Sequence, residues 1–396
     1  MSVLDGVRVI DLTQALAGPY STMLLGDMGA EVIKVEQPHA GDQSRGWGPP
    51  FIEGESAYFL AINRNKKSLT LDLKSEKGKA VMHRLVSQAD VFVTNLPRRS
   101  SRRKTGVDSS TLLALNPRLV YVSITGYGMT GPDAERPGYD VIAQGESGLM
   151  SLTGEPEGEP YRYPIPLADM TAGVYAALGV AGALFARERS GSGQVLDISL
   201  LESQTTWLAI LASAYLNAGK EPQRLGNLHP NIAPYEVFRT KDKYIIVGVG
   251  TQRLWELFCD LLGLKEEIMN DPRFATNADR LDNRTELSGI IEDKLSRREA
   301  SFWLEAFRKA RIPSGPINSV PDALSHPQLL ERGFLVELVH KTAGRVKSLA
   351  HPIQFSASTN EYRLPPPILG EHNRELLESL GFSSGEIEAL KKEEVI

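Results

Sequence analysis

A strand, helix and strand at the N-terminus constrain the fold of this chain more than any other feature. Residues 7–12 (VRVIDL) and 31–36 (EVIKVE) have the β-branched, apolar composition of buried strands. Residues 20–28 between them are expected to be helical, because Gly18 and Pro19 suit a helix start. Two strands joined by a helix run parallel through a right-handed crossover. The sequence therefore predicts a parallel sheet covered by helices.

The same alternation continues through the first half of the chain. Further strands are expected at 69–73, 91–94, 119–124 and 195–199, and helices at 75–88, 109–116, 170–187 and 200–217. This predicts an α/β fold with a Rossmann-like large domain over residues 1–218. Strands at 235–239 and 244–248 and helices at 252–262, 283–295 and 299–310 predict a smaller α+β domain over 219–330. A β-rich stretch, three prolines and two short helices in 331–396 are expected to return to the large domain.

Composition excludes several classes of function. A net charge of -5 provides no overall attraction for nucleic acid or anionic membranes. The single cysteine, Cys259, fits a reducing compartment, and with no apparent secretion signal we expect a cytoplasmic protein. The seven histidines lack metal-ligand spacing, so no metal site is expected. Residues 170–186 resemble a membrane span, but they are short and rich in small residues, which favours a buried helix.

Asp169 is the most informative acidic residue. It follows Pro164-Ile165-Pro166-Leu167-Ala168 and is expected to open a helix rich in glycine and alanine. A carboxylate at that position would receive backbone N–H groups and the positive end of the helix dipole, which favour its ionised form. An ionised carboxylate at a buried helix start could attack a thioester. Position alone leaves an ordinary helix cap as the alternative reading.

Basic residues form two groups after predicted strands. The first comprises Arg64, Lys66, Lys67 and Lys74, and the second Arg98, Arg99, Arg102, Arg103 and Lys104. Loops at the carboxyl ends of parallel strands line the ligand crevice of an open α/β sheet, so these groups could hold a phosphorylated nucleotide. A solvated polar face is the alternative. The first strand–helix turn lacks the three-glycine dinucleotide fingerprint, although Glu36 ends the second strand, so a nicotinamide enzyme is a weak alternative.

A series of short motifs in a fixed order runs through nearly the whole chain. They are Ala17-Gly18-Pro19-Tyr20, residues 29–36, Gly41-Asp42, residues 63–68, residues 123–128, Gly131-Pro132, Gly138-Tyr139-Asp140, Leu167-Ala168-Asp169, Gly193-Gln194, residues 224–227 and Gly370-Glu371-His372. On these motifs the chain resembles the family III CoA-transferases, which exchange coenzyme A between carboxylic acids. It looks closest to members that use succinyl-CoA and dicarboxylates such as glutarate.

The resemblance implies a fold, a partner and a mechanism. The fold is a Rossmann-like large domain and a smaller domain in an interlocked homodimer. CoA thioesters and carboxylic acids are implied as substrates (EC 2.8.3 type), with no permanently bound cofactor. The carboxylate of Asp169 would form an acyl anhydride and then an aspartyl-CoA thioester.

The resemblance also places binding residues. Implied CoA contacts are Leu16, Ala17, Leu71, Asp72, Leu73, Lys74, Asn95, Leu96, Arg103, Lys104 and Tyr139. Implied substrate residues are Trp47 and Tyr58, with Arg45 or Arg64 as our inferred anchor for a second carboxylate.

The chain departs from the family pattern at three places. Residues 97–106 are one residue longer than usual and put Lys104 where an arginine is expected. Pro38 stands where oxalate-type members have a basic residue, and residues 227–234 take the place of the glycine-run loop of those members, so oxalate is a less expected acceptor. Two other functions remain open. An α-methylacyl-CoA racemase shares the fold but would need a histidine where this chain has Tyr139. The other is a non-catalytic CoA-binding protein.

Overall fold

The computed structural model describes residues 1–396 and divides them into two compact units. The first unit comprises residues 1–150, 162–220 and 329–396, and the second comprises 151–161 and 221–328. Residues 151–161 were expected in the large domain but belong to the second unit. The reason is local bonding: the Arg224 guanidinium donates hydrogen bonds to the carbonyl groups of Ser151, Glu155 and Gly158 at 2.9–3.2 Å.

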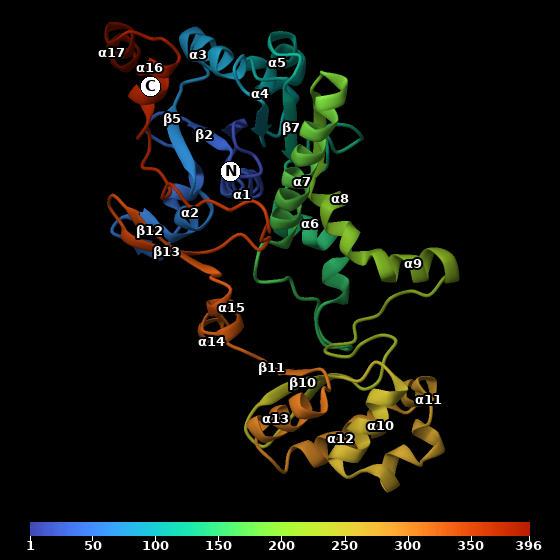
Figure 1. Cartoon of the computed structure of the whole chain (residues 1–396). Coiled ribbons are helices and arrows are strands. Elements are labelled where there is room, and N and C mark those ends of the chain that lie inside the picture. Colours follow the sequence, from blue (N-terminus) through green and yellow to red (C-terminus); the bar gives the residue numbers. More distant parts are fainter. The chain divides into compact units, whose positions relative to one another are not determined.

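A six-stranded parallel sheet forms the centre of the first unit (Figure 1). Its order is β5-β2-β1-β6-β7-β8, and its strands are β1 (Arg8–Leu12), β2 (Glu31–Glu36), β5 (Lys66–Thr70), β6 (Val91–Thr94), β7 (Val120–Thr125) and β8 (Gln194–Ser199). Strand β1 lies in the middle, with Val9 opposite Val32 of β2 and Val91 of β6. The strand order therefore reverses direction between β1 and β6.

Helices cover both faces of this sheet. The main ones are α1 (Ala17–Asp27), α3 (Glu76–Val86), α5 (Ser109–Leu115), α7 (Leu167–Ser190), α16 (Asn373–Ser379) and α17 (Ser384–Lys392). Because successive side chains on a strand point to opposite faces, Val9 belongs to the core that contains α1 and α7. Its neighbour Ile10 belongs to the core that contains α3, α5, α16 and α17. The sheet is thus buried on both sides.

Shorter elements complete the first unit. They are β3 (Phe51–Ile52), β4 (Glu55–Ser56), α2 (Ala57–Ile62), α4 (Arg99–Lys104), α6 (Asp140–Glu146), α8 (Leu200–Thr205), α9 (Ala209–Ala218), and the hairpin β12 (Leu335–His340) and β13 (Gly344–Leu349). The expected helix over 200–217 is broken, since a 3-10 turn at Thr206–Leu208 separates α8 from α9. The C-terminal helices lie against the sheet, with α16 packed on β5.

Two predicted boundaries were wrong in an instructive way. Helix α1 begins at Ala17, three residues before the expected start, because Pro19 lies in the first turn, where its missing N–H is not needed. Strand β5 covers Lys66–Thr70 instead of 69–73. The charged side chain of Lys66 concealed the strand start in the sequence, because a lysine in a buried strand is rare without a partner.

The second unit is a small α+β arrangement. Its antiparallel sheet has the order β11-β10-β9, formed by β9 (Tyr235–Arg239), β10 (Tyr244–Gly248) and β11 (Ser314–Pro316). Its helices are α10 (Gln252–Leu262), α11 (Asn277–Asp282), α12 (Arg284–Leu295), α13 (Ala300–Ala310) and α14 (Val320–Leu324), and α15 (Pro327–Glu331) follows at the boundary. Its core is aromatic, with Trp255, Phe258 and Phe307 fully buried.

Helix α7 is the one helix long and apolar enough to cross a membrane by length and composition. Half of its most apolar window is buried within the protein, and α7 packs along α1. It therefore serves as a core helix of the first unit.

Candidate active site

A crevice of about 390 Å³ opens at the carboxyl ends of β1, β2, β5 and β6. This is the place where the strand order reverses, which is where open α/β sheets bind their ligands. Six residues that the family resemblance assigned to CoA line it, namely Leu71, Asp72, Leu73, Lys74, Asn95 and Leu96. Lys74 is exposed and gives the crevice a free positive charge.

A second pocket of about 200 Å³ adjoins this crevice and contains Asp169. The two share the lining residues Gln14, Gln43, Asn95 and Pro97. Leu16, Ala17 and Tyr139 also line the Asp169 pocket. The structure therefore brings Asp169 and nine of the eleven implied CoA residues to one connected cavity.

The position of Asp169 on its helix differs from the sequence-based expectation. Helix α7 begins at Leu167, so Asp169 is the third residue of the first turn and does not cap the helix. The cap comes from another element, because Oδ1 of Asp140 accepts the N–H of Ala168 at 2.7 Å and that of Asp169 at 3.4 Å. The side chain of Asp169 is thereby left free of helix-capping bonds and available to the pocket.

The Asp169 carboxyl has an unusual proton affinity. Burial raises its pKa from 3.8 to about 7, and the nearby negative charge of Asp140 acts in the same direction. This reverses the expectation that the helix dipole keeps the group ionised. A carboxylate that is poorly solvated and poorly hydrogen-bonded is a stronger base and nucleophile than an ordinary aspartate.

Close backbone contacts bring the pocket walls together. A Cβ placed on Gly173, one turn after Asp169, would lie 2.8 Å from the carbonyl oxygen of Ala17, so α7 touches the start of α1 at this glycine. A Cβ on Gly126 would lie 2.6 Å from the Cα of Gly138. That crossing places the loop before Asp140 beside the end of β7.

Two aromatic residues assigned to the acyl pocket contact each other. The rings of Trp47 and Tyr58 meet edge to face with centroids 4.9 Å apart. Burial raises the pKa of the Tyr58 phenol to about 12, and the charges of Asp169 and Asp140 act in the same direction. The phenol therefore stays protonated at neutral pH and can donate a hydrogen bond to an anion. Neither residue lines the 200 Å³ pocket, so their substrate role stays a prediction.

The two arginines proposed as carboxylate anchors have other partners. Arg64 is 2% exposed, and its guanidinium forms two hydrogen bonds with Asp27 at 2.9 and 2.6 Å. Its burial and pairing speak against an anchor role, which stays a prediction. Arg45 makes a similar pair with Glu36 at 2.8 and 2.9 Å and stacks on the Phe59 ring. Neither guanidinium lines the Asp169 pocket.

The other predicted basic residues divide into buried and exposed ones. Lys66 is fully buried and binds Asp11 at 3.0 Å, so it cannot reach a nucleotide. Arg102 is also buried and donates to the Ser123 hydroxyl. Arg103 and Lys104 are exposed on α4, but they do not line either cavity, although the next residue, Thr105, does. Their CoA contacts remain predictions.

Sequence reasoning missed four pocket residues. Asp140 was quoted only as part of a motif, although it caps α7. Gln14 and Gln43 line both cavities. Asp42, 1% exposed, lines the larger crevice. An acidic residue next to a Gly-Tyr or Gly turn is an available cap or turn signal, but its partner lies 28 residues away in the case of Asp140 and could not be assigned from sequence.

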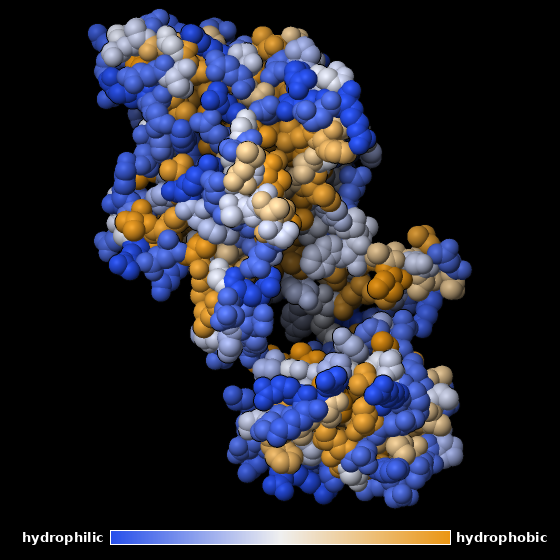
Figure 2. Space-filling model, viewed as in Figure 1, coloured by the Kyte–Doolittle hydropathy of each residue, from blue (hydrophilic) through white to orange (hydrophobic).

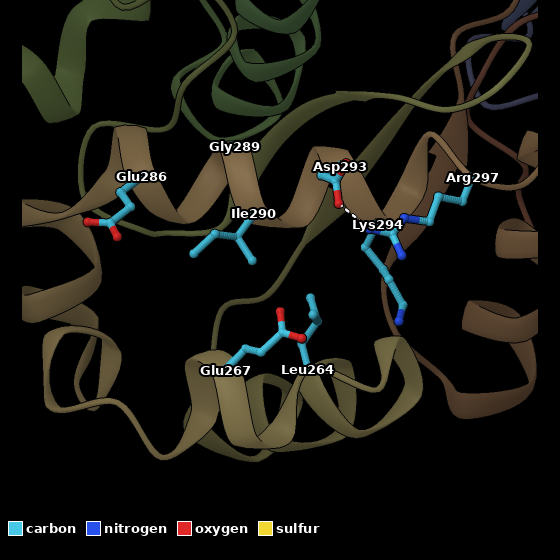
Figure 3. A pocket seen from close by; sticks show the side chains of 8 residues that line it. All are labelled: Leu264, Glu267, Glu286, Gly289, Ile290, Asp293, Lys294 and Arg297. Carbon is cyan, nitrogen blue, oxygen red and sulfur yellow. Dashed lines mark hydrogen bonds and ion pairs between the residues drawn. The ribbon is translucent and has the colours of Figure 1, made fainter.

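No group of three or more histidine, cysteine, aspartate or glutamate side chains is placed to hold a metal ion. A separate hollow of about 430 Å³ in the second unit is lined by acidic and basic side chains of α12 and the turn at Leu264 and Glu267 (Figure 3). Two of its acids are already paired: Glu286 with Arg273, and Asp293 with Arg297. The cavity around Asp169 is the better candidate for chemistry.

A family model described as CoA-transferase family III matches residues 4–373. The chain belongs to this family. It is 42% identical over 392 residues to the succinyl-CoA:glutarate CoA-transferase of Mus musculus, covering 98% of this chain and 89% of that protein. It is 43% identical to the succinate–glutarate CoA-transferase of Agrobacterium fabrum, covering 95% of both chains. The protein is therefore an enzyme, a CoA-transferase.

A solved structure supports the fold of this family III member. The crystal structure of a CAIB/BAIF family protein from Brucella suis superposes with a TM-score of 0.86 at 41% identity, covering 96% of this chain and 99% of that one. Nearly all of the α/β architecture is thus shared with a protein of known structure. The residues that line its pocket include the carboxyl groups of Asp140 and Asp169 and no histidine.

Proposed function

We propose that this enzyme transfers CoA from succinyl-CoA to a dicarboxylic acid such as glutarate, with Asp169 as the covalent carrier. One observation carries the proposal: Asp169 lies in a pocket that shares four lining residues with the crevice at the strand ends. A nucleotide in the 390 Å³ crevice could extend its thioester arm into the smaller pocket. The strand order β5-β2-β1-β6-β7-β8 is that of the doubly wound nucleotide-binding fold, which supports this placement.

The mechanism follows from a buried carboxylate facing a thioester. An oxygen of Asp169 attacks the succinyl-CoA carbonyl, the C–S bond breaks, and an aspartyl–succinyl anhydride and CoA thiolate form. The thiolate attacks the aspartyl carbonyl and releases succinate, which leaves an aspartyl-CoA thioester. The acceptor carboxylate then attacks that carbonyl and expels the thiolate. The thiolate finally takes the acceptor acyl group, and Asp169 is regenerated.

The assignment of substrates rests on the relatives. The mouse and Agrobacterium proteins are named for succinyl-CoA or succinate and glutarate. No lysine or arginine lines the 200 Å³ pocket, so a second carboxylate of the acceptor must find its positive partner outside those lining residues. The lack of a pocket histidine argues against the racemase alternative, because α-proton exchange needs a base on each face.

A homodimer is the second part of the proposal. Helix α9 buries none of its residues, and Ile210 and Leu216 are each 77% exposed. Figure 2 shows hydrophobic surface where α9 lies in Figure 1. Helix α7 also exposes Leu178 and Phe185 at 64% and 63%. Exposed apolar surface on two helices is typical of a protein–protein interface. A second copy of this chain, interlocked with the first, would cover it. Light scattering after size-exclusion chromatography should give twice the 43.5 kDa chain mass.

The decisive experiment targets Asp169. Asp169→Ala should abolish transfer from succinyl-CoA to glutarate while the variant remains folded by circular dichroism. Incubation of the native enzyme with succinyl-CoA and then hydroxylamine should inactivate it, and mass spectrometry should locate a hydroxamate on Asp169. Asp260→Ala, an exposed carboxylate of α10 in the second unit, is the control and should keep full activity. Near-normal turnover by Asp169→Ala would refute the proposal.

A further inference from the structure

A completely buried ion pair borders the 390 Å³ crevice that adjoins the Asp169 pocket. The Nζ of Lys34 is 2.8 Å from Oδ2 of Asp42, and neither side chain has exposed surface. Burial raises the pKa of Asp42, but Lys34 together with the backbone N–H groups of Ser44 and Ala15 lowers it on balance, and the neighbouring carboxylates likewise outweigh burial and raise the pKa of Lys34. Both groups are therefore charged. Burying a charged pair brings little net stability, so stability alone does not account for this pair.

Both members of the pair bind the backbone of the same short segment. The Nζ of Lys34 donates to the carbonyl oxygen of Thr13 at 2.9 Å. Oδ1 of Asp42 accepts the N–H of Ala15 at 3.1 Å. Between these two points, the Asn95 side chain donates to the carbonyl of Gln14 and accepts its N–H. The backbone of residues 13–15 is thus fixed at every residue.

The segment needs such fixation because Ala15 has a left-handed backbone with φ of 68°. This conformation costs a residue with a Cβ roughly 1 kcal/mol or more and persists only when the surroundings impose it. In this conformation the backbone N–H of Ala15 donates to Oδ1 of Asp42 at 3.1 Å. The turn before Asp42 is equally specific, since Gly41 has φ of 65° and a Cβ there would press on the Arg45 side chain at 2.9 Å.

Ala15 lies two residues before the first residue of helix α1. No side chain caps α1, and its first turn contains no acidic residue. The first backbone N–H groups of a helix have no intrahelical acceptor. Leu16 and Ala17 line the same 200 Å³ pocket as Asp169. The uncapped start of α1 and the Asp169 carboxyl group therefore border the same pocket.

We propose that Asp42, held by Lys34, is a positioning residue for CoA transfer. It imposes the left-handed conformation of Ala15 and thereby aims the uncapped start of α1 into the Asp169 pocket. There the helix N–H groups can stabilise the negative oxygen that forms when a carbonyl is attacked. Asp42 itself touches no reacting atom. The inference rests on the proposed role of Asp169 and adds the structural element that orients its surroundings.

The test uses three variants of the full-length enzyme. Asp42→Ala removes the acceptor of the Ala15 N–H and should lower kcat by about 10- to 100-fold, the range expected when a catalytic element shifts by about 1 Å. The KM for succinyl-CoA should change less than about threefold, because the Asp42 side chain, although it borders the crevice, has no exposed surface and is paired with Lys34. Ala15→Gly alone is the reference for the double variant, because glycine adopts a positive φ without steric cost. Ala15→Gly combined with Asp42→Ala should recover most of the lost kcat.

Recovery of kcat by the double variant distinguishes a positioning role of Asp42 from a general structural role. If the double variant is no more active than Asp42→Ala, Asp42 does not act through Ala15 and the inference fails. It fails equally if Asp42→Ala retains full kcat or if only KM rises. Should Asp42→Ala not fold because Lys34 is left unpaired, Lys34→Met is added to both variants, which removes the buried charge and leaves the same comparison.

Asp271→Ala is the matched control, and Asp169→Ala is the reference for the proposed function. Asp271 accepts a backbone N–H at the start of a 3-10 turn in the second unit, as Asp42 does at Gln43–Gly46, and Asp271→Ala should leave kcat unchanged. Activity of Asp169→Ala tests the proposed function independently. An inactive Asp169→Ala with a fully active Asp42→Ala would overturn only the present inference, whereas an active Asp169→Ala would overturn the proposed function as well.

Discussion

Oδ1 of Asp140 accepts the backbone N–H of Asp169 at 3.4 Å, so two carboxylates lie at the start of the same helix. One caps α7, and the other faces the pocket. The charge on the first makes ionisation of the second less favourable, and this adds to the larger effect of burial. The pair therefore gives the proposed nucleophile a proton affinity that can be adjusted by mutation.

Asp140→Asn should shift the acidic limb of the pH profile to lower pH. Asp169 must be deprotonated to attack, so kcat/KM should rise with pH through a pKa of about 7 in the native enzyme. The amide oxygen of asparagine can still accept the two N–H groups, but the negative charge is gone. Because burial is the larger cause, the limb should move only part of the way toward 3.8. An unchanged limb would show that Asp140 does not influence Asp169.

Asp169→Asn should make the folded protein more stable at high pH. The folded pKa, about 7, exceeds the ordinary value of 3.8, so the folded state binds the proton more tightly than the unfolded state. The stabilising contribution of this group is complete below pH 3.8 and is lost as pH rises to about 7. One pKa unit corresponds to about 1.4 kcal/mol, and with partial solvent exposure we expect a gain of about 1–2 kcal/mol at pH 8.

Urea unfolding of Asp169→Asn and native protein at pH 5 and pH 8 measures this effect. The difference between the two proteins should be larger at pH 8 than at pH 5. Asp260→Asn, which changes an exposed carboxylate, should show the same small difference at both values. A variant that is less stable than the native protein at pH 8 would contradict a raised pKa for Asp169.

The sequence predicted the sheet and its helices because buried parallel strands are continuous apolar runs, as in residues 91–94 and 119–124. It also singled out Asp169, whose helix is visible as a long stretch of small residues. It could not predict that Asp140 caps this helix, because capping across 28 residues depends on the Gly126–Gly138 crossing. Local spacing carries no information about such a contact.

The positions of two charged side chains, Arg64 and Lys66, also could not be predicted from the sequence. From the sequence, Arg64 and Lys66 could either hold a nucleotide or belong to a solvated polar face, whereas both are buried with the carboxylates of Asp27 and Asp11. A charge in an apolar strand can mark a ligand site or a buried ion pair, and only the three-dimensional position of its partner distinguishes the two.

Arg64→Met should destabilise the protein without changing its acceptor preference. The substitution leaves the Asp27 carboxylate buried and without its guanidinium partner, which typically costs about 3–5 kcal/mol. Thermal unfolding should therefore shift to a clearly lower temperature. The ratio of kcat/KM for glutarate to that for a monocarboxylic acid should stay unchanged at a temperature where the variant is folded. Adding Asp27→Leu should restore part of the stability, because it removes the uncompensated charge. A selective loss of dicarboxylate activity would instead return Arg64 to the role of substrate anchor.

Gly173→Ala should reduce activity by separating α7 from α1. A Cβ at this position would lie 2.8 Å from the Ala17 carbonyl oxygen and 3.0 Å from the Tyr20 ring, so one of the two helices must move. Such overpacking typically costs about 1–3 kcal/mol, and the movement would displace Asp169 from the start of α1, so we expect kcat to fall at least about tenfold. Gly289→Ala on α12 is the matched control (Figure 3), because a methyl group there would have no neighbour within 4 Å. Replacing a helical glycine by alanine should stabilise the folded protein by up to about 1 kcal/mol and leave kcat unchanged. Steady-state kinetics and urea unfolding of both variants measure the difference, and equal behaviour of the two would show that the Gly173 contact does not hold the pocket together.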